Sequence, residues 1–329
     1  MSEGFMPLTR FVLPALVLSA VGLAHPAHGI VAGVPDGTTP DSPANRIDPN
    51  TDASPFAGVV SYTTGSAICT GTLISPFHVL TAAHCVTNDS TGVLNTSPGS
   101  VTVNFNGDTQ VTRGATAITV NPSYSGFNNS IHDDLAIITL DAAAPAFADV
   151  YPLYDQNVVF GDELTFVGYG RSGNGNLGYT TDASASVKRT GGNEVNGFEA
   201  DDDVPGGLGV DELYLFDFDG PSGDGLGGGP TLGNDFETTF GGGDSGGPAF
   251  IDDGTTLSLA AVNSFVFSLP DAEVPGDQTA APLFGSGGGG VLIAPYLGFI
   301  NGVIPEPASF VLLSVLALGL TPRRRPRRA

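Results

Sequence analysis

Residues 241–248 read Gly241-Gly242-Gly243-Asp244-Ser245-Gly246-Gly247-Pro248, and this stretch is a strong signal of both fold and chemistry. A glycine-rich turn accounts for the glycines, because glycine adopts backbone conformations that residues with a β-carbon avoid. It does not account for Asp244, Ser245 and Pro248 in register with them. A serine hydroxyl is a weak nucleophile at neutral pH and needs a base to take its proton. The stretch therefore predicts that Ser245 is a nucleophile whose base lies elsewhere in the chain.

The base is expected among the histidines. Outside the N-terminal leader there are three, His78, His84 and His132. His84 lies in Thr81-Ala82-Ala83-His84-Cys85, directly after the strand-like residues 77–80. The near-neutral pKa of histidine suits it to proton transfer. The sequence therefore predicts that His84 is the base.

A carboxylate is expected to orient that histidine by accepting its other ring N–H. Asp134 directly precedes the apolar residues 135–138, and Asp133 is its rival. The residues by themselves leave both aspartates open.

In the order His84, Asp134, Ser245, the three segments resemble the chymotrypsin/trypsin family of serine peptidases. The resemblance covers about residues 30–300. In the family the catalytic aspartate directly precedes the apolar strand, which favours Asp134 over Asp133. It implies an all-β fold of two six-stranded antiparallel β-barrels, with the active site in the cleft between them. It also implies hydrolysis of protein or peptide substrates through an acyl-enzyme, with neither a cofactor nor a metal.

The resemblance assigns further roles around the nucleophile. Gly243 and Ser245 are expected to supply the backbone N–H groups of the oxyanion hole. Asp244 is expected to pair with a new N-terminal amine at Ile30, because Ile30-Val31-Ala32-Gly33 resembles the mature N-terminus of the family, with Ala where a first Gly is usual. Arg46-Ile47 is the second candidate for the activation site.

Four residues are expected near the substrate side chain. In the family, the position of Thr239 lies at the base of the pocket, and threonine there disfavours a preference for Lys or Arg. Ser264, Phe265 and Val266 resemble the segment that pairs with the substrate backbone and lines the pocket. Val266 replaces the usual glycine and would narrow the pocket, so small or medium apolar side chains are expected.

The chain has two cysteines, Cys69 and Cys85. Export would favour a disulfide between them. They fit the family positions on either side of the catalytic histidine, and the resemblance implies that the bridge holds the loop of His84.

Composition also predicts β structure, because 47 glycines and 25 prolines leave few uninterrupted stretches for helices. The body, residues 30–304, is expected to divide near residue 150 into barrels at about 30–150 and 151–304.

Residues 191–233 are Gly-rich and acidic and are expected to form a solvated surface insertion. Asp217 and Asp219 within it are too few to predict a calcium site. The strand-like runs are 57–62, 68–74, 101–105, 110–120, 135–140, 163–169, 213–218, 249–251, 256–267 and 290–293.

The two ends of the chain are predicted to be targeting signals. Residues 1–29 have a basic flank, a short apolar core and Ala27-His28-Gly29, the pattern of a signal peptide. Signal peptidase is therefore expected to expose Ile30. Residues 305–329 contain Pro305-Glu306-Pro307, a short apolar run and terminal arginines, and they resemble the PEP-CTERM signal of Gram-negative bacteria. That resemblance implies processing by an exosortase and export to the cell surface or extracellular matrix; a simple C-terminal transmembrane helix is the alternative.

Charge limits the partners of the body. The ends hold six of the 11 basic residues but only two of the 34 acidic ones, which leaves the body at −27. Such a surface repels nucleic acid and anionic membranes, so membrane contact is expected only through the terminal segments. Two other functions fit the sequence less well. A catalytically weak adhesive or matrix protein usually lacks a triad residue, and a lipid esterase would need a Gly-x-Ser-x-Gly elbow.

Overall fold

The computed structural model describes residues 30–304 apart from 35–36, 39–40, 66, 221–231, 234–235 and 269–281. Within these residues the chain is mostly β-strand, with one short α-helix and a few turns of 3-10 helix. The all-β prediction is confirmed. The helical segments are η1 (Pro43–Arg46), η2 (Ala83–Cys85), η3 (Pro98–Ser100), η4 (Ala294–Tyr296) and α1 (Leu297–Val303).

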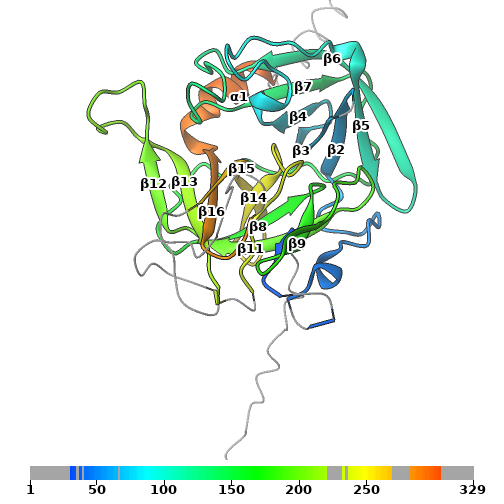
Figure 1. Ribbon diagram of the computed structural model, residues 1–329. Coiled ribbons are helices and arrows are strands. Elements are labelled where there is room, and N and C mark those ends of the chain that lie inside the picture. Colours follow the sequence, from blue (N-terminus) through cyan, green and yellow to red (C-terminus); the bar gives the residue numbers. More distant parts are fainter. Residues whose placement is uncertain are drawn as a thin grey trace, which may run out of the picture.

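The first half of the body forms a closed antiparallel barrel, at the upper right of Figure 1. Its interior is filled by buried apolar side chains, including Tyr62, Leu73, Phe105 and Ile138. Alternation of side chains along each strand places these residues inside the barrel. Its strands, in the order β2-β3-β4-β7-β6-β5, are β2 (Val59–Thr64), β3 (Ala67–Ser75), β4 (His78–Thr81), β5 (Val101–Asn106), β6 (Gln110–Val120) and β7 (Ala136–Leu140).

The second half forms a seven-stranded antiparallel sheet. A side chain joins β11, at one end of the sheet, to β13, the second strand from the other end: the Asn193 amide on β11 donates to the carbonyl oxygens of Asp217 on β13 (2.6 Å) and Thr238 (3.0 Å). The sheet therefore curls on itself, and β12 extends it beyond β13. Its strands, in the order β11-β8-β14-β15-β16-β13-β12, are β8 (Glu163–Gly168), β11 (Arg189–Glu194), β12 (Gly197–Ala200), β13 (Asp211–Phe218), β14 (Pro248–Asp252), β15 (Leu257–Ser268) and β16 (Ser286–Leu292).

A small third sheet holds the beginning of the body. It consists of β1 (Val31–Ala32), β9 (Ser172–Asn174) and β10 (Gly178–Thr181). β1 runs parallel to β9, and Ile30 before it is fully buried in the same cluster as Phe166 and Phe216 of the second sheet. The first residues of the body are thus anchored inside the second half of the fold.

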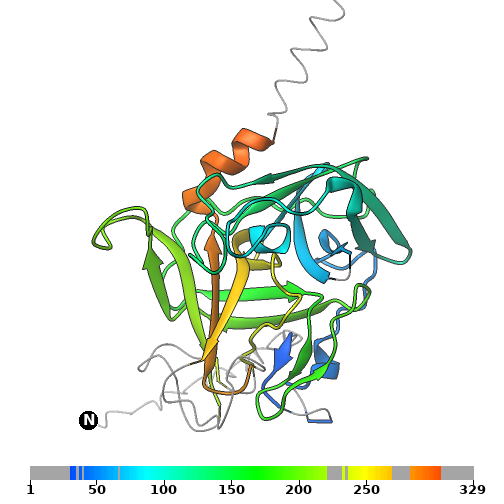
Figure 2. The same cartoon turned by 45° about the horizontal axis from the view of Figure 1, so that its top comes forward.

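A further apolar cluster lies where the two halves meet. It combines Leu80 and Leu135 from the first half with Phe250 and Val262 from the second, and Ile300 of α1 packs against them. Fully burying one such side chain contributes about 1.5–3 kcal/mol. Figure 2 shows α1 following β16 and lying beside the first barrel. The cluster holds the two halves together next to the candidate site.

Residues 191–233 differ from the expected solvated insertion. β11, β12 and β13 all use residues of this range, and Leu213, Tyr214 and Phe216 are completely buried. Tyr214 and Phe216 pack in the apolar cluster of the second sheet and Leu213 packs where the two halves meet, so the prediction of one surface insertion is wrong for this part. The hairpin of β12 and β13 does extend from one side of the molecule, at the left in Figure 1.

The division near residue 150 stays a prediction; it falls between β7 and β8. The predicted terminal segments, 1–29 and 305–329, lie outside the described residues. Among the residues that are described, no helix has both the length and the apolar character needed to cross a bilayer.

Candidate active site

The register of two neighbouring strands brings His84 and Asp134 together. β4 and β7 are antiparallel, and Thr81 pairs with Ala136 at the end of the ladder. His84 follows β4 in η2, and Asp134 precedes β7, so both lie just beyond the same end. The His84 Nδ1 atom lies 2.6 Å from Asp134 Oδ2, and the His84 backbone N–H donates to Asp134 Oδ1 at 2.7 Å. Both carboxylate oxygens thus hold the histidine.

The surroundings of this pair favour its charged form. Burial alone would raise the pKa of the Asp134 carboxyl, but the charge and hydrogen bonds of His84 and the Ser264 hydroxyl bring it below its ordinary value. Burial lowers the pKa of His84, and the Asp134 carboxylate more than offsets this, so the pKa is raised overall. The Phe127 ring packs on the imidazole, with centroids 4.9 Å apart. His84 is therefore held in one orientation and made more basic.

The Ser245 loop has a backbone that needs glycine. Gly243 and Gly246 have φ values of 103° and 82°, which residues with a β-carbon rarely adopt. A β-carbon at position 246 would also collide with the Thr81 hydroxyl and the Thr70 carbonyl. The Gly246 N–H donates to the Asn263 carbonyl at 2.8 Å. The loop is thus packed against both halves of the fold.

Thr70 on β3 connects this loop to the first barrel. Its backbone N–H donates to the Ser245 carbonyl and its hydroxyl donates to the Gly243 carbonyl, each at 2.9 Å. The same hydroxyl accepts from the Tyr169 N–H at 3.1 Å. The sequence analysis did not predict this role of Thr70. Its position next to Cys69 was the feature that could have indicated it.

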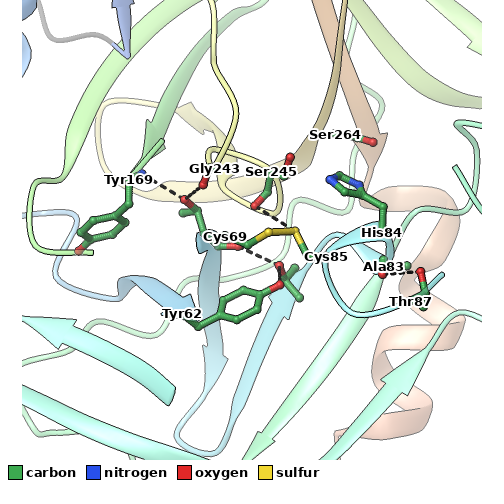
Figure 3. The surroundings of a disulfide bond; sticks show 12 residues. Tyr62, Cys69, Ala83, His84, Cys85, Thr87, Tyr169, Gly243, Ser245 and Ser264 are labelled. Atoms are coloured by element: carbon green, nitrogen blue, oxygen red, sulfur yellow. Dashed lines mark hydrogen bonds between the residues drawn. A yellow bond between two sulfur atoms is a disulfide. The ribbon is translucent and has the colours of Figure 1, made fainter. Parts of the chain in front are cut away.

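The predicted disulfide is present. Cys69 and Cys85 are bonded, and Cys85 Sγ lies 3.8 Å from the Ser245 carbonyl oxygen. A disulfide sulfur carries no proton, so this is a packing contact. Figure 3 shows the bridge with Ser245, His84 and Ser264 around it. The bridge places the backbone of Ser245 next to the residue that follows His84.

Two backbone N–H groups of the loop stand out. In the described part of the chain, Gly243 and Ser245 donate no backbone hydrogen bond, whereas Asp244, Gly246 and Gly247 all do. Gly243 and Ser245 are only partly buried. Within the same part no hydrogen bond joins the Ser245 hydroxyl to His84, a contact that often tightens only when substrate is present.

Asp244 is fully buried beneath the loop. Its carboxylate accepts the N–H groups of Gly170 at 2.7 Å and Gly241 at 2.9 Å. Burial raises the pKa of Asp244 to about 7, although these hydrogen bonds and the charge of Arg189 act in the opposite direction. Ile30 lies in the second half of the fold, but its nitrogen is a peptide amide while Gly29 precedes it. The predicted pairing of the two therefore stays a prediction.

At the second candidate for the activation site, Arg46 is enclosed although Ile47 is 45% exposed. Arg46 is 1% exposed, forms an ion pair with Asp41 and donates to the Phe236 carbonyl. Ile47 forms a β-bridge with Arg189. A protease would have to open this structure before it could cleave after Arg46.

Three of the four predicted pocket residues are buried, and one is exposed. Thr239 is completely buried and its N–H donates to Val31, so its backbone is covered by β1. The Ser264 hydroxyl donates to Asp134 Oδ2 at 2.5 Å. Phe265 is nearly buried, whereas Val266 is 45% exposed and pairs with Gly288 of β16. Of the four, Val266 is the side chain most available to a substrate.

The chain is similar to one family model and to one curated protein. The trypsin family model matches residues 45–198. Brachyurin from Leptuca pugilator is 34% identical over 112 residues, which is 33% of this chain. The match spans about half, 48%, of Brachyurin. These matches support a chymotrypsin/trypsin-like peptidase, and with the closed six-stranded barrel they confirm the predicted chymotrypsin-like fold class.

Proposed function

We propose that the protein is a serine endopeptidase in which Ser245, His84 and Asp134 form the catalytic triad. The observation that carries the proposal is the double hydrogen bond between His84 and the buried Asp134 carboxylate. It orients a base of raised pKa beside the hydrogen-bonded loop that holds Ser245. The match to the trypsin family model supports the same reaction class.

The reaction follows from the roles of these groups. His84 Nε2 takes the Ser245 proton as Oγ attacks the carbonyl carbon of the substrate, and Asp134 stabilises the imidazolium that forms. His84 then gives this proton to the leaving amine as the peptide C–N bond breaks, leaving an acyl ester on Ser245. A water molecule, deprotonated by His84, releases the acid and restores the hydroxyl.

The backbone N–H groups of Gly243 and Ser245 are proposed to form the oxyanion hole. Their lack of backbone acceptors in the described structure leaves them available to a developing oxyanion. The positive φ of Gly243 supports this role, because it sets the direction of the adjoining peptide groups. Such donors stabilise the transition state without reorganising during the reaction.

The side-chain preference is proposed to be for small or medium apolar residues. Val266 supports this, because its exposed side chain occupies a position where glycine would leave more room. Thr239 brings no negative charge to attract Lys or Arg. The substrates are proposed to be proteins or peptides.

Maturation and location are proposed from the terminal sequences. Signal peptidase would remove residues 1–29 during export, and the new amine of Ile30 would pair with Asp244. The burial of Ile30 against the second sheet supports this step. Residues 305–329 would be recognised by an exosortase, which would bring the body to the surface or matrix of a Gram-negative bacterium.

The proposed activity can be tested with the purified protein and two variants. Ser245→Ala should abolish both cleavage of a diverse peptide library and covalent labelling by a fluorophosphonate. Ser186→Ala, which changes an exposed serine, should leave both unchanged. The cut sites of the active protein would report the side-chain preference. Equal cleavage by the protein and its Ser245→Ala variant would overturn the proposal.

A further inference from the structure

Three side chains that can bind metals meet beside the proposed active site. They are His132, Asp202 and Glu212, and one potential ligand atom from each lies within 4.8 Å of the other two. His132 Nδ1 and Glu212 Oε2 lie 3.1 Å apart. His132 and Glu212 are buried, whereas Asp202 is exposed at the tip of the β12–β13 hairpin. The cluster thus has two buried members and one that solvent can reach.

The surroundings of the cluster are negative. Asp133 lies close enough to Glu212 for their charges to repel each other, and Asp202 also acts on Asp133. Among the described residues, the ion-pair contacts of this cluster join its carboxylates to the His132 ring, and no lysine or arginine takes part in them. Because buried carboxylates need a compensating positive charge, this arrangement favours a cation.

A tyrosine hydroxyl also lies among these carboxyl groups. The Tyr296 side chain is 7% exposed, and its hydroxyl faces the carboxyl groups of Glu212 and Asp133. The hydroxyl interacts with both carboxyl groups as a donor, but within the described residues neither contact has the geometry of a full hydrogen bond. Its one proton can serve only one of the two carboxyl groups at a time, so it does not compensate their negative charge.

The outer contacts resemble those of metal ligands. His132 Nε2 lies 3.6 Å from a carboxylate oxygen of Glu199, and Ser130 donates to Asp202 Oδ2 at 2.6 Å. Histidines that bind metals commonly direct the second ring nitrogen to a carboxylate, which fixes the tautomer. Metal binding would displace the proton shared between Nδ1 and Glu212, and the ring would keep a proton on Nε2, which faces Glu199.

We propose that His132 Nδ1, Glu212 and Asp202 bind one divalent transition-metal ion of the zinc class, with water in a remaining position. A nitrogen ligand together with carboxylates favours zinc over calcium, which prefers oxygen ligands alone. Bonds of about 2.1 Å require ligand atoms closer together than 4.8 Å. The exposed Asp202 can make this approach by a small movement of the hairpin tip.

The metal would join two segments that are far apart in sequence. His132 lies two residues before Asp134, and Asp133 between them has a φ of 60°, unusual for a residue other than glycine. Asp202 and Glu212 belong to the β12–β13 hairpin. Binding would therefore fasten the hairpin to the loop that carries Asp134. The site does not depend on the proposed peptidase activity.

Titration calorimetry with zinc chloride tests the site. The full protein with Ser245→Ala is used, so that self-digestion cannot alter the sample. One zinc ion should bind per chain and raise the melting temperature. His132→Gln, Glu212→Gln and Asp202→Asn should each weaken binding by at least about tenfold. Asp202 is exposed, so its variant keeps the test valid if a buried substitution prevents folding.

Two controls and one comparison complete the experiment. Asp211→Asn changes an exposed carboxylate on the same hairpin, and His78→Gln removes another histidine; both should keep full affinity. Calcium chloride should bind more weakly than zinc. The proposal is overturned if no stoichiometric zinc binding occurs, or if His132→Gln and Asp202→Asn, folded as judged by circular dichroism, bind zinc as tightly as the parent.

Discussion

The Ser264 hydroxyl donates a 2.5 Å hydrogen bond to Asp134 Oδ2, the oxygen that also lies 2.6 Å from His84 Nδ1. Ser264 is on β15 of the second half of the fold, whereas Asp134 and His84 belong to the first. The charge of Asp134 is thus stabilised from both halves. This contact ties the orientation of the proposed base to the docking of the two halves.

Replacing Ser264 should weaken both the fold and the activity. Ser264→Ala leaves a fully buried carboxylate with one hydrogen bond fewer, which should cost about 1.5–3 kcal/mol in the free energy of unfolding. The value of kcat/KM should also fall, because the His84–Asp134 pair is held less firmly. Urea unfolding and peptide hydrolysis measure the two effects. Ser258→Ala on the same strand is the control, and equal stability of the two variants would contradict this role.

The two neighbouring aspartates should differ strongly in their effect on catalysis. Asp134→Asn keeps the shape of the side chain but removes the charge and favours the wrong tautomer of His84. By analogy with the serine-peptidase triad, kcat should fall by about 10⁴. Asp133→Asn should lose far less activity, because no contact joins Asp133 to His84 in the described structure. Steady-state kinetics decides between them, and a larger loss in Asp133→Asn would reverse the assignment.

The pH dependence of kcat/KM should reflect the raised pKa of His84. Only the neutral imidazole can accept the Ser245 proton, so activity should rise with pH through a value above that of an ordinary histidine. The contribution of His84 to the stability of the fold changes with pH in the opposite direction. Because the pKa of His84 is raised on folding, this contribution is complete below the unfolded-state pKa and is lost as the pH rises through the folded-state pKa. A pH profile with its acid limb at or below the ordinary histidine value would contradict this prediction.

The chain that retains Gly29 and the chain that begins at Ile30 should differ in how their stability depends on pH, because Asp244 is buried without a new amine in the first. Its pKa rises from an ordinary value of 3.8 to about 7, so in a chain that retains Gly29 the folded state should lose stability as the pH rises between these values. In a chain beginning at Ile30, the new amine should offset the charge of Asp244 and remove this loss. Urea midpoints at pH 5 and pH 8 for both chains test the pairing. Asp244→Asn should remove the difference, and the same pH dependence in both unmodified chains would count against it.

Loss of the disulfide should destabilise the protein and disturb the site. The two cysteines are 16 residues apart, and closing a loop of this length contributes about 3 kcal/mol in the unfolded-chain entropy model. Replacing Cys69 and Cys85 together with alanine should therefore lower the unfolding midpoint and reduce activity, because the bridge packs on the Ser245 carbonyl. Thermal unfolding with and without a reductant checks this. No response to the reductant in the unmodified protein would contradict the prediction.

Much of the fold class and the candidate site could be predicted from local sequence. A nucleophile loop with glycines at positions 243 and 246 has a short-range signature, because the backbone there excludes other residues. The same applies to His84 beside Cys85 and to Asp134 before an apolar strand. The β-strands were recognisable because apolar runs were short and separated by turn residues.

Residues 191–233 show where composition misleads. Glycine and aspartate dominate the range and suggested a solvated insertion, yet Tyr214 and Phe216 belong to the apolar cluster of the second sheet and Leu213 to the cluster between the two halves. Their burial depends on pairing with β16, about 70 residues later in the chain and itself rich in glycine. Local patterns do not encode such a partner.

The sequence by itself thus determined the types of chemical group and the local backbone that each requires: a serine in a glycine turn, a histidine after a strand, an aspartate before one, and two cysteines. The tertiary structure alone decided which groups meet. Ser264 lies 130 residues from Asp134, Thr70 lies 173 residues from Gly243, and Glu212 lies 80 residues from His132. These contacts arise from strand register and from the packing of one half against the other, and neither is expressed in the spacing of residues along the chain.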